Sequence, residues 1–440
     1  MKRIKDIFKN NPLDSHSHKI QLLWIYAIAT IVALWMYADI SVAYSNDSPH
    51  YMSAGETFLS GRLHNFRTPL YPLIYHFAKS VAGGAAGHIV VILQILLFML
   101  SILAFYRSCC FLVQSRKIVF IASLLYAIHP GIILWNQFII TESFAISGAV
   151  ILFFFVVEFY KKQRVWSAVA IPVTILALIA LRPSSIYFTP ALALFTLYML
   201  VKRRKYAWTL FSGLIISAIA VAGYCFKFYQ EYGIFSPSNV SILNQYYFLR
   251  KSNLLKVDNA TSDNMKIFIA DILSEEEGTE TMDQFEEFTF LVERFGHRET
   301  NKMIKNAIGR EQSRYSGFII QQIMDVRNFP AFSHFVNMET VSLPGKIYIK
   351  ACFFLLAFPF HLVYLFLAAY AIVLYFYSRK KRHSTLIHWF ILLTVVSNLM
   401  LILIGAVSEW HRLFVPSMPL LFIMMASVAD KLRIKGSTTV

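Results

Sequence analysis

Apolar runs of about 20 residues recur along nearly the whole chain, and their length limits the possible folds more than any other feature. A helix rises 1.5 Å per residue, so about 20 apolar residues are needed to cross the ~30 Å hydrocarbon layer of a membrane. Each run is therefore predicted to be a spanning helix. We expect about ten of them, at 22–38, 87–106, 118–134, 141–160, 165–181, 185–201, 207–228, 354–377, 386–405 and 413–430.

The composition agrees with a membrane protein. Of the 440 residues, 57% are hydrophobic and 16% aromatic, whereas soluble domains are typically 45–50% apolar. The four cysteines lie within or beside apolar runs, so no disulfide framework is indicated. The predicted fold class is an all-α polytopic membrane protein.

Positive charge is concentrated in the short segments between the apolar runs. The net charge of +16 would also suit a nucleic-acid-binding protein, but such a protein gathers its charge on one face or in one basic domain, so we exclude this class. Short cytoplasmic loops of membrane proteins collect Lys and Arg. The clusters fall on alternate loops, at 107–117, 161–164, 202–205, 379–382 and 431–435.

Both ends of the chain are expected in the cytoplasm. Lys2, Arg3 and Lys5 precede the first span, and no small-residue cleavage site follows it, so we expect an uncleaved span rather than a signal peptide.

Two long segments are expected on the outer side. The first is an outer loop at 39–86 within an N-terminal transmembrane module at 1–228, and the second is a large, acidic outer loop at 229–353. A C-terminal group of transmembrane helices follows at 354–440. We expect helices at 48–60, 281–296 and 301–325, and irregular structure at 236–264.

Residues able to carry chemistry gather in the first outer loop. Asp47 could accept a proton from an acceptor hydroxyl, and Arg67 could pair with a phosphate through two parallel hydrogen bonds. A structural alternative is that Asp47 begins a helix as its N-cap.

The order of motifs resembles a known family. The first loop shows D-x-x-x-Y from Asp47 to Tyr51, then A-x-x-x-F-L-S-G, then R-T-P-x-Y-P-L from Arg67. This order is similar to the first outer loop of GT-C membrane glycosyltransferases, in particular bacterial proteins similar to protein O-mannosyltransferases and aminoarabinose transferases (the glycosyltransferase family 39-like proteins). Further matching stretches, in the same order, are His129-Pro130, Thr141-Glu142-Ser143, Leu181-Arg182-Pro183-Ser184-Ser185 and Glu409-Trp410-His411-Arg412.

The resemblance implies roles for individual residues. It implies that Asp47 is the base or aligns the reacting groups, with Asp39 as a rival nearer the membrane. Ser48 stands where several relatives have a second acidic residue, which leaves a metal shared by that pair in question. Donor phosphate-binding residues would be Arg412, Arg182 and Arg67, and acceptor or supporting residues would be Glu142, Tyr51, Glu409 and His411.

Several of these residues also have a structural explanation. Glu142 begins a span at its outer end, where the helix dipole favours an acid, and Arg182 could extend its side chain to the interface. Arg412 stands in an outer turn against the positive-inside trend, so it needs a partner. That partner is either Glu409, three residues earlier, or a lipid phosphate. His411 could be an interfacial residue.

The expected function is transfer of a monosaccharide from a polyprenyl-phosphate lipid to a protein, lipid or glycan acceptor on the outer face. No glycine-rich phosphate loop or D-x-D triplet indicates a nucleotide-sugar donor. No cofactor is assigned, and a divalent cation is left open. The alternative functions are a transporter or lipid flippase, and a non-catalytic scaffold. The expected location is the bacterial inner membrane, with the endoplasmic reticulum membrane as the alternative.

Overall fold

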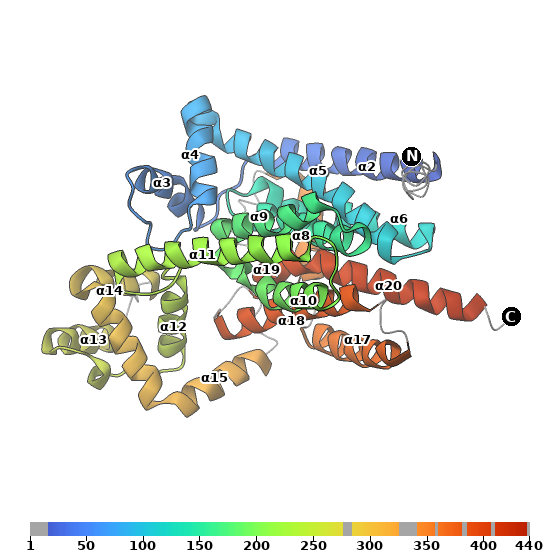
Figure 1. Cartoon of the computed structure of the whole chain (residues 1–440). Helices are drawn as coiled ribbons and strands as arrows, with labels where there is room; N and C mark the ends of the chain where they lie inside the picture. The colour runs from blue at the N-terminus through green and yellow to red at the C-terminus, as the bar shows by residue number, and fades with distance from the viewer. Residues whose placement is uncertain are drawn as a thin grey trace.

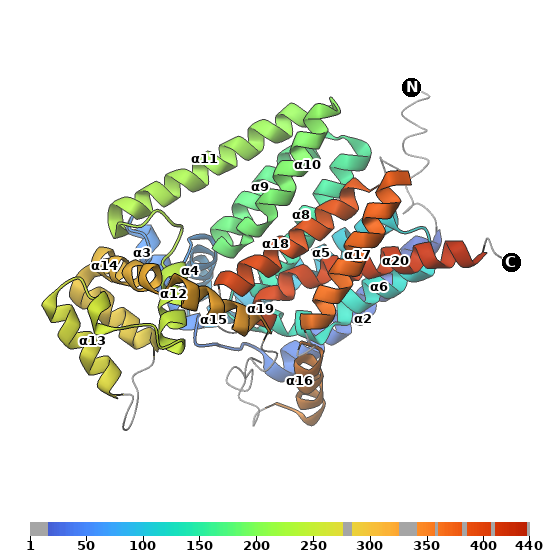
Figure 2. The same cartoon turned by 90° about the horizontal axis from the view of Figure 1, so that it is seen from below.

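The computed structural model describes residues 16–275, 284–324, 341–356, 360–380, 385–405 and 410–437. Long helices run side by side in a bundle, with the start of α2 and the end of α20 at one end of the bundle and α12 to α15 at the other (Figures 1 and 2). The helices of the bundle are α2 (His16–Ile40), α5 (Ala86–Leu112), α6 (Arg116–Ile128), α8 (Glu142–Lys162), α9 (Val165–Leu181), α10 (Thr189–Val201), α11 (Ala207–Tyr232), α17 (Phe360–Lys380), α18 (Leu386–Gly405) and α20 (Met418–Ser437).

The remaining helices lie outside these spans or join them. They are α3 (Ser48–Leu59), α4 (Leu70–Ala82), η2 (Gly83–Ala85), α7 (Pro130–Ile133), η3 (Leu134–Gln137), η4 (Pro183–Phe188), α12 (Val240–Lys251), η5 (Val257–Asn259), α13 (Asp263–Glu275), α14 (Gln284–Arg310), α15 (Gln312–Met324), α16 (Leu343–Leu356), α19 (Trp410–Phe414) and η7 (Val415–Ser417).

Each predicted span overlaps helices of the structure, so the helical, multi-pass prediction is confirmed. The span predicted at 354–377 corresponds mainly to α17, and its residues 357–359 lie outside the described residues. Within the described residues, seven helices are long and apolar enough to cross a membrane, and a bent pair would be an eighth. Two further apolar helices, Val165–Leu181 and Leu362–Phe376, are shorter. The expected count of about ten is therefore reached only when these two are included.

The third predicted span is bent rather than straight. Arg116–Ile128 and Pro130–Gln137 meet at an angle of 49°. Pro130 has no backbone N–H and disfavours helical geometry at the residue before it, and His129 accordingly has φ −64° and ψ 120°. The bend leads the chain through α7 and η3 toward the start of α8.

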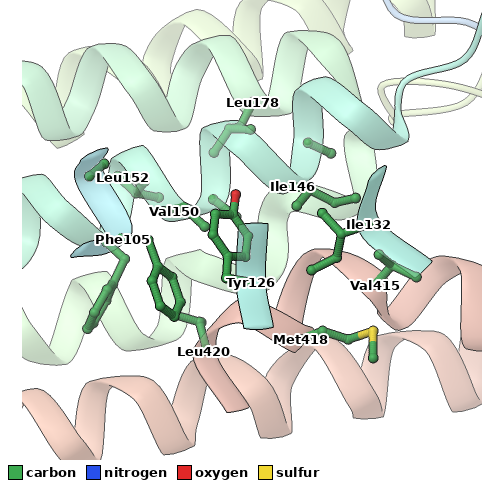
Figure 3. Close-up of a cluster of buried hydrophobic side chains, with 14 of the residues drawn as sticks. Phe105, Tyr126, Ile132, Ile146, Val150, Leu152, Leu178, Val415, Met418 and Leu420 are labelled. Carbon is green, nitrogen blue, oxygen red and sulfur yellow. The ribbon is translucent and has the colours of Figure 1, made fainter. Parts of the chain in front are cut away.

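Helix α8 lies in the middle of the bundle (Figures 1 and 2). Its Ile146, Val150 and Leu152 pack in the buried cluster of Figure 3 with side chains from α5, α6, α9 and α20. A Cβ added at Gly148 would lie 2.6 Å from Leu178 Cδ2, so the glycine allows α8 and α9 to approach closely. This packing holds the outer end of α8 in one place.

The two outer segments form one body, which we call the outer unit (α3 and α12 to α15). The first outer loop is joined to the end of α11 and to the segment after it: Lys227 Nζ donates to the Gly61 carbonyl at 2.8 Å and the Tyr232 hydroxyl to the Leu63 carbonyl at 2.6 Å. The Asn239 N–H donates to the Asn65 carbonyl at 3.0 Å. The loop therefore has a defined conformation.

Parts of the large outer loop differ from the sequence prediction. The segment at 236–264, expected to be irregular, contains α12, whose Ile242, Tyr246 and Leu249 are buried in the core of the outer unit. The helices expected at 281–296 and 301–325 correspond to α14 and α15, but α14 continues past a kink at Gly296 (φ 80°) to Arg310. Part of the first range lies outside the described residues.

Candidate active site

Asp47 lies between two arginines at the outer end of the bundle. Its Oδ1 accepts a hydrogen bond from Arg67 Nη2 at 2.6 Å, and its Oδ2 accepts one from Arg412 Nη2 at 3.1 Å. Arg67 lies in the loop between α3 and α4, and Arg412 lies in α19. The carboxylate therefore connects the first outer loop to the helix that precedes the last span.

A second carboxylate extends the arrangement. Glu142, the first residue of α8, places Oε1 3.3 Å from Arg412 Nε and 3.2 Å from Arg182 Nη1. Arg182 follows α9 directly, and its Nε donates to Ser184 Oγ at 2.9 Å. Together these contacts form a continuous chain of charges, which we call the outer charge cluster: Arg67, Asp47, Arg412, Glu142 and Arg182.

Tyr51 holds the Arg67 side chain in place. The guanidinium lies over its ring, 4.3 Å from the centroid, and Arg67 Nη1 donates to its hydroxyl at 3.2 Å. The face of an aromatic ring attracts a cation. The edge-on contact of Tyr71 with Tyr51, at 5.1 Å between centroids, supports the ring from behind.

Backbone hydrogen bonds between two segments bring Asp47 and Glu142 close to each other. The Ala43 N–H donates to the Gln137 carbonyl at 2.8 Å, and the Ile139 N–H donates to the Ala43 carbonyl at 3.0 Å. Gln94 Nε2 adds a bond to the Phe138 carbonyl at 3.0 Å. The segment leading to Asp47 is thus paired with the segment leading to Glu142.

The cluster holds more positive than negative charge. Its three arginine side chains are only 11–13% exposed and Glu142 4%, whereas Asp47 is 31% exposed. Arg67 Nε is buried and forms no hydrogen bond with any of the described residues, and the buried Arg182 Nη1 has only its ion pair with Glu142. Buried donors of this kind usually meet water or an ion. Within the described residues, three cations therefore surround two carboxylates, and such a site suits an anion. The anion would enter beside Asp47, the most exposed member of the cluster.

The arginines also control the charge of Asp47. Burial alone would raise the pKa of this carboxyl, but the guanidiniums of Arg67 and Arg412 outweigh burial and hold its pKa well below the ordinary value. Asp47 is consequently ionised at neutral pH. While both arginines contact it, it is also a weak proton acceptor.

His64 positions Arg67 through the backbone. Its Nδ1 accepts the N–H groups of Phe66 and Arg67 at 3.1 and 3.2 Å. Burial, together with the nearby charge of Arg67, lowers the pKa of His64 to about 4. The ring is therefore neutral at physiological pH, as the two accepted bonds require.

The structure brings together six of the residues that the sequence singled out: Asp47, Tyr51, Arg67, Glu142, Arg182 and Arg412. Glu409, the expected structural partner of Arg412, lies outside the described residues, as does the side chain of His411. Among the described residues, Arg412 contacts Asp47 and Glu142.

The rival base, Asp39, is committed to another contact. It accepts the N–H and the hydroxyl of Ser342 at 2.9 and 2.8 Å, at the start of α16. None of the contacts described for it reaches a member of the outer charge cluster.

Comparison with solved structures defines the fold. The apo oligosaccharyltransferase of Archaeoglobus fulgidus superimposes with a TM-score of 0.51, at 14% identity, over 97% of this chain and 52% of its own.

The chain has a GT-C fold.

It spans about half the length of that oligosaccharyltransferase. The archaeal oligosaccharyltransferase AglB from the same organism, in complex with an inhibitory peptide and a dolichol-phosphate, gives a TM-score of 0.48 at 12% identity over 96% of this chain and 52% of its own. ArnT from Cupriavidus metallidurans, bound to undecaprenyl phosphate, gives 0.38 at 9% identity over 92% and 78%. No sequence-family model and no curated protein matches the chain.

The residues around Asp47 do not fit a divalent cation. Both carboxylate oxygens of Asp47 accept from arginines, and the adjacent Ser48 uses its hydroxyl to accept the Ser45 N–H at 2.8 Å. Across the described ranges, no three His, Cys, Asp or Glu side chains come close enough to hold a metal. We therefore derive no chemical step through a metal.

The residues that position the site were not predicted from the sequence. Ser184 was within a motif that resembled GT-C proteins, but its bond to Arg182 depends on the turn after α9. His64 and Gln94 act through backbone groups of other segments, which no local pattern indicates. Their signal is buried polarity: Gln94 is fully buried within an apolar span.

Proposed function

We propose that the chain transfers a monosaccharide from a polyprenyl-phosphate lipid to an acceptor hydroxyl at the face that carries the outer unit. The observation that supports this most is the positive excess of the outer charge cluster, at the end of a membrane bundle. A lipid donor suits this position because its phosphate can meet the arginines while its tail stays in the bilayer. The matched fold is that of an oligosaccharyltransferase, which supports glycosyl transfer as the class of reaction.

The donor phosphate would take the place between Arg67, Arg182 and Arg412. Guanidinium groups bind phosphate oxygens through pairs of parallel hydrogen bonds. The buried donor Arg67 Nε is available for this without breaking a hydrogen bond within the described residues, whereas Arg182 Nη1 would share its ion pair with Glu142.

The charge of the cluster suits the leaving group. In the reaction, the bond between the sugar anomeric carbon and the phosphate oxygen breaks, and the bond from the acceptor oxygen to that carbon forms. The phosphodiester donor carries one negative charge and leaves as a phosphomonoester that gains another. Fixed cations at the position where charge develops lower the barrier.

Asp47 would accept the proton from the acceptor hydroxyl. Its pKa is held low by Arg67 and Arg412, but a bound phosphate competes for the same guanidinium groups. Donor binding would therefore release the Asp47 carboxylate and raise its pKa toward the ordinary value, so that it becomes a base only when the donor is present.

The proposal includes a location. The basic loops at the end opposite the outer unit favour cytoplasmic termini, so the site would face the periplasm of a bacterial inner membrane, with the endoplasmic reticulum lumen as the alternative. The sugar would be a hexose or a pentose.

The test is Asp47→Asn in the purified full-length protein, assayed with a radiolabelled panel of polyprenyl-phosphate sugars. We expect sugar transfer to fall by roughly 10²- to 10⁴-fold with normal folding. Asp263→Asn is the matched control, because this aspartate is 91% exposed in the outer unit. Wild-type-like transfer by Asp47→Asn would reject Asp47 as the base. Lipid translocation by the wild type without any transfer would favour the flippase.

A further inference from the structure

A polar cavity of about 560 Å³ lies at the end of the bundle that carries the basic loops, which we call the basic face. Helix α8 connects the two sites: it begins at Glu142 in the outer charge cluster, and Lys161 near its other end lines the cavity. That separation is about 28 Å along a helix, close to the ~30 Å thickness of the hydrocarbon layer. The cavity therefore lies at the depth of the headgroups of the opposite leaflet.

The charged lining of the cavity is mainly cationic. Arg116 begins α6, and Lys161 and Lys431 come from α8 and α20. The carboxylate in the lining, Asp430, is 4% exposed and accepts the N–H groups of Gln114 and Ser115 at 2.8 and 3.0 Å. Asp430 is thus committed to the start of α6.

Arg116 and Lys161 form no ion pair within the described part of the chain. Asp430 contacts Arg433 at 3.8 Å. Arg116 and Lys161 are consequently available to an anion from outside.

Two buried histidines face the same cavity. His18 and His388 are each 6% exposed, and each uses Nδ1 for a tyrosine hydroxyl, with Tyr106 and Tyr370, at 2.7 Å. The Nε2 atom of each ring forms no hydrogen bond with the described residues, so it is the nitrogen left for a ligand. The positive-inside rule accounts for Arg and Lys at this face but not for two oriented, buried histidines behind them.

We propose that this cavity binds the phosphate group of a lipid headgroup with net negative charge, in the leaflet at the basic face. Its volume lies within the range of small-molecule sites. Basic pockets between transmembrane helices bind anionic headgroups. Phe111, Leu112 and Val113 also line it and offer an apolar surface to the lipid chain. The site is separate from the outer charge cluster and needs no sugar transfer.

The test measures lipid retention by native mass spectrometry of the full-length protein in mild detergent, with phosphatidylglycerol and phosphatidylcholine of equal chain length. The double variant Arg116→Gln with Lys161→Gln should retain phosphatidylglycerol about tenfold less than the wild type. Lys117→Gln with Lys202→Gln removes the same charge from the same face at positions outside the cavity lining, and should retain it normally.

Two further measurements decide between explanations. Arg116→Lys with Lys161→Arg keeps both positive charges and should retain phosphatidylglycerol as the wild type does. That result would show that the glutamine variant loses retention through charge and not through misfolding. Equal retention of the two lipids by the wild type, or equal loss in both glutamine pairs, would overturn the proposal. If inorganic phosphate raises the melting temperature of the wild type but not of the Arg116→Gln, Lys161→Gln pair, and no lipid preference is seen, the ligand is a soluble phosphate and the lipid source is wrong.

Discussion

The molecule contains two buried groups of charges near the same end of the bundle, and they are built differently. In the core of the outer unit, Arg250 donates through Nε and Nη2 to the two oxygens of Glu287, each at 2.9 Å, and the Tyr246 hydroxyl adds a bond at 2.7 Å. There, one arginine is joined to both oxygens of one carboxylate. In the outer charge cluster, as far as the structure describes it, three arginines share two carboxylates, and the buried Arg67 Nε forms no hydrogen bond.

This difference separates a structural contact from a candidate binding site. A buried ion pair is stable only when charge and hydrogen bonds are satisfied on both sides. Arg250 and Glu287, with side chains 4% exposed, meet that condition and connect α12 to α14. In the outer charge cluster, the buried Arg67 Nε has no hydrogen bond within the described residues. We therefore assign the Arg250 pair to stability and the cluster to ligand binding.

The largest expected effect on stability is at the Arg250 pair. Glu287→Ala leaves a buried guanidinium without its carboxylate, so the free energy of unfolding in mild detergent should fall by about 3–5 kcal/mol. Glu286→Ala, at the exposed neighbouring position, should change it by less than about 0.5 kcal/mol. Equal effects at the two positions would contradict the assignment.

Arg412→Gln should change stability little and reduce sugar transfer strongly. It leaves two arginines for two carboxylates, so the free energy of unfolding should change by roughly 1 kcal/mol or less. The rate of sugar transfer should nevertheless fall by about 10²- to 10³-fold, because a cation is missing where charge develops. Arg62→Gln, which changes an exposed arginine of the first outer loop, is the control and should transfer normally. If Arg412→Gln lowers the free energy of unfolding as much as Glu287→Ala does, Arg412 serves stability, as Arg250 does.

A smaller effect is expected from pH on the outer unit. Burial lowers the pKa of His297 to about 4, and burial with the charge of Arg67 does the same for His64. The unfolded chain, with histidine pKa values near 6.5, then binds more protons than the folded chain. The stabilisation is present above pH 6.5 and is lost as the pH falls toward 4.

Hydrogen exchange at the Phe66 and Arg67 amides measures this loss. These amides should exchange faster as the pH is lowered through that range, after correction for the intrinsic rate. His64→Asn keeps a hydrogen-bond acceptor without a titrating group, so it should reduce the pH dependence. An unchanged dependence in His64→Asn would assign the effect to other groups.

Much of the fold follows from local sequence, because a spanning helix depends mainly on a run of apolar residues. The runs at 141–160 and 386–405 correspond to helices with nearly the same ends. The bend at His129-Pro130 and the helix α12 were not predicted from the sequence. The first depends on how a proline is accommodated, and the second on burial against α14.

The members of the candidate site were predictable as residue types, but their pairing was not. Asp47 and Arg412 are separated by 365 positions in the sequence, so only the folded bundle shows that they touch. From the sequence, the partner of Arg412 was either Glu409, three residues earlier, or a lipid phosphate, and Glu409 lies outside the described residues. Glu142 and Arg182 meet because α8 begins where α9 ends, an arrangement set by the packing of those helices.

The most direct test of the central claim is binding of a polyprenyl phosphate to the full-length protein, measured as the rise in melting temperature relative to the uncharged polyprenol. We predict that the phosphate raises the melting temperature of the wild type and of the Arg116→Gln, Lys161→Gln pair, and that Arg67→Gln with Arg412→Gln loses most of this rise. If the Arg67→Gln, Arg412→Gln pair keeps the full rise, or if polyprenol has the same effect on the wild type, the outer charge cluster is not a phosphate site.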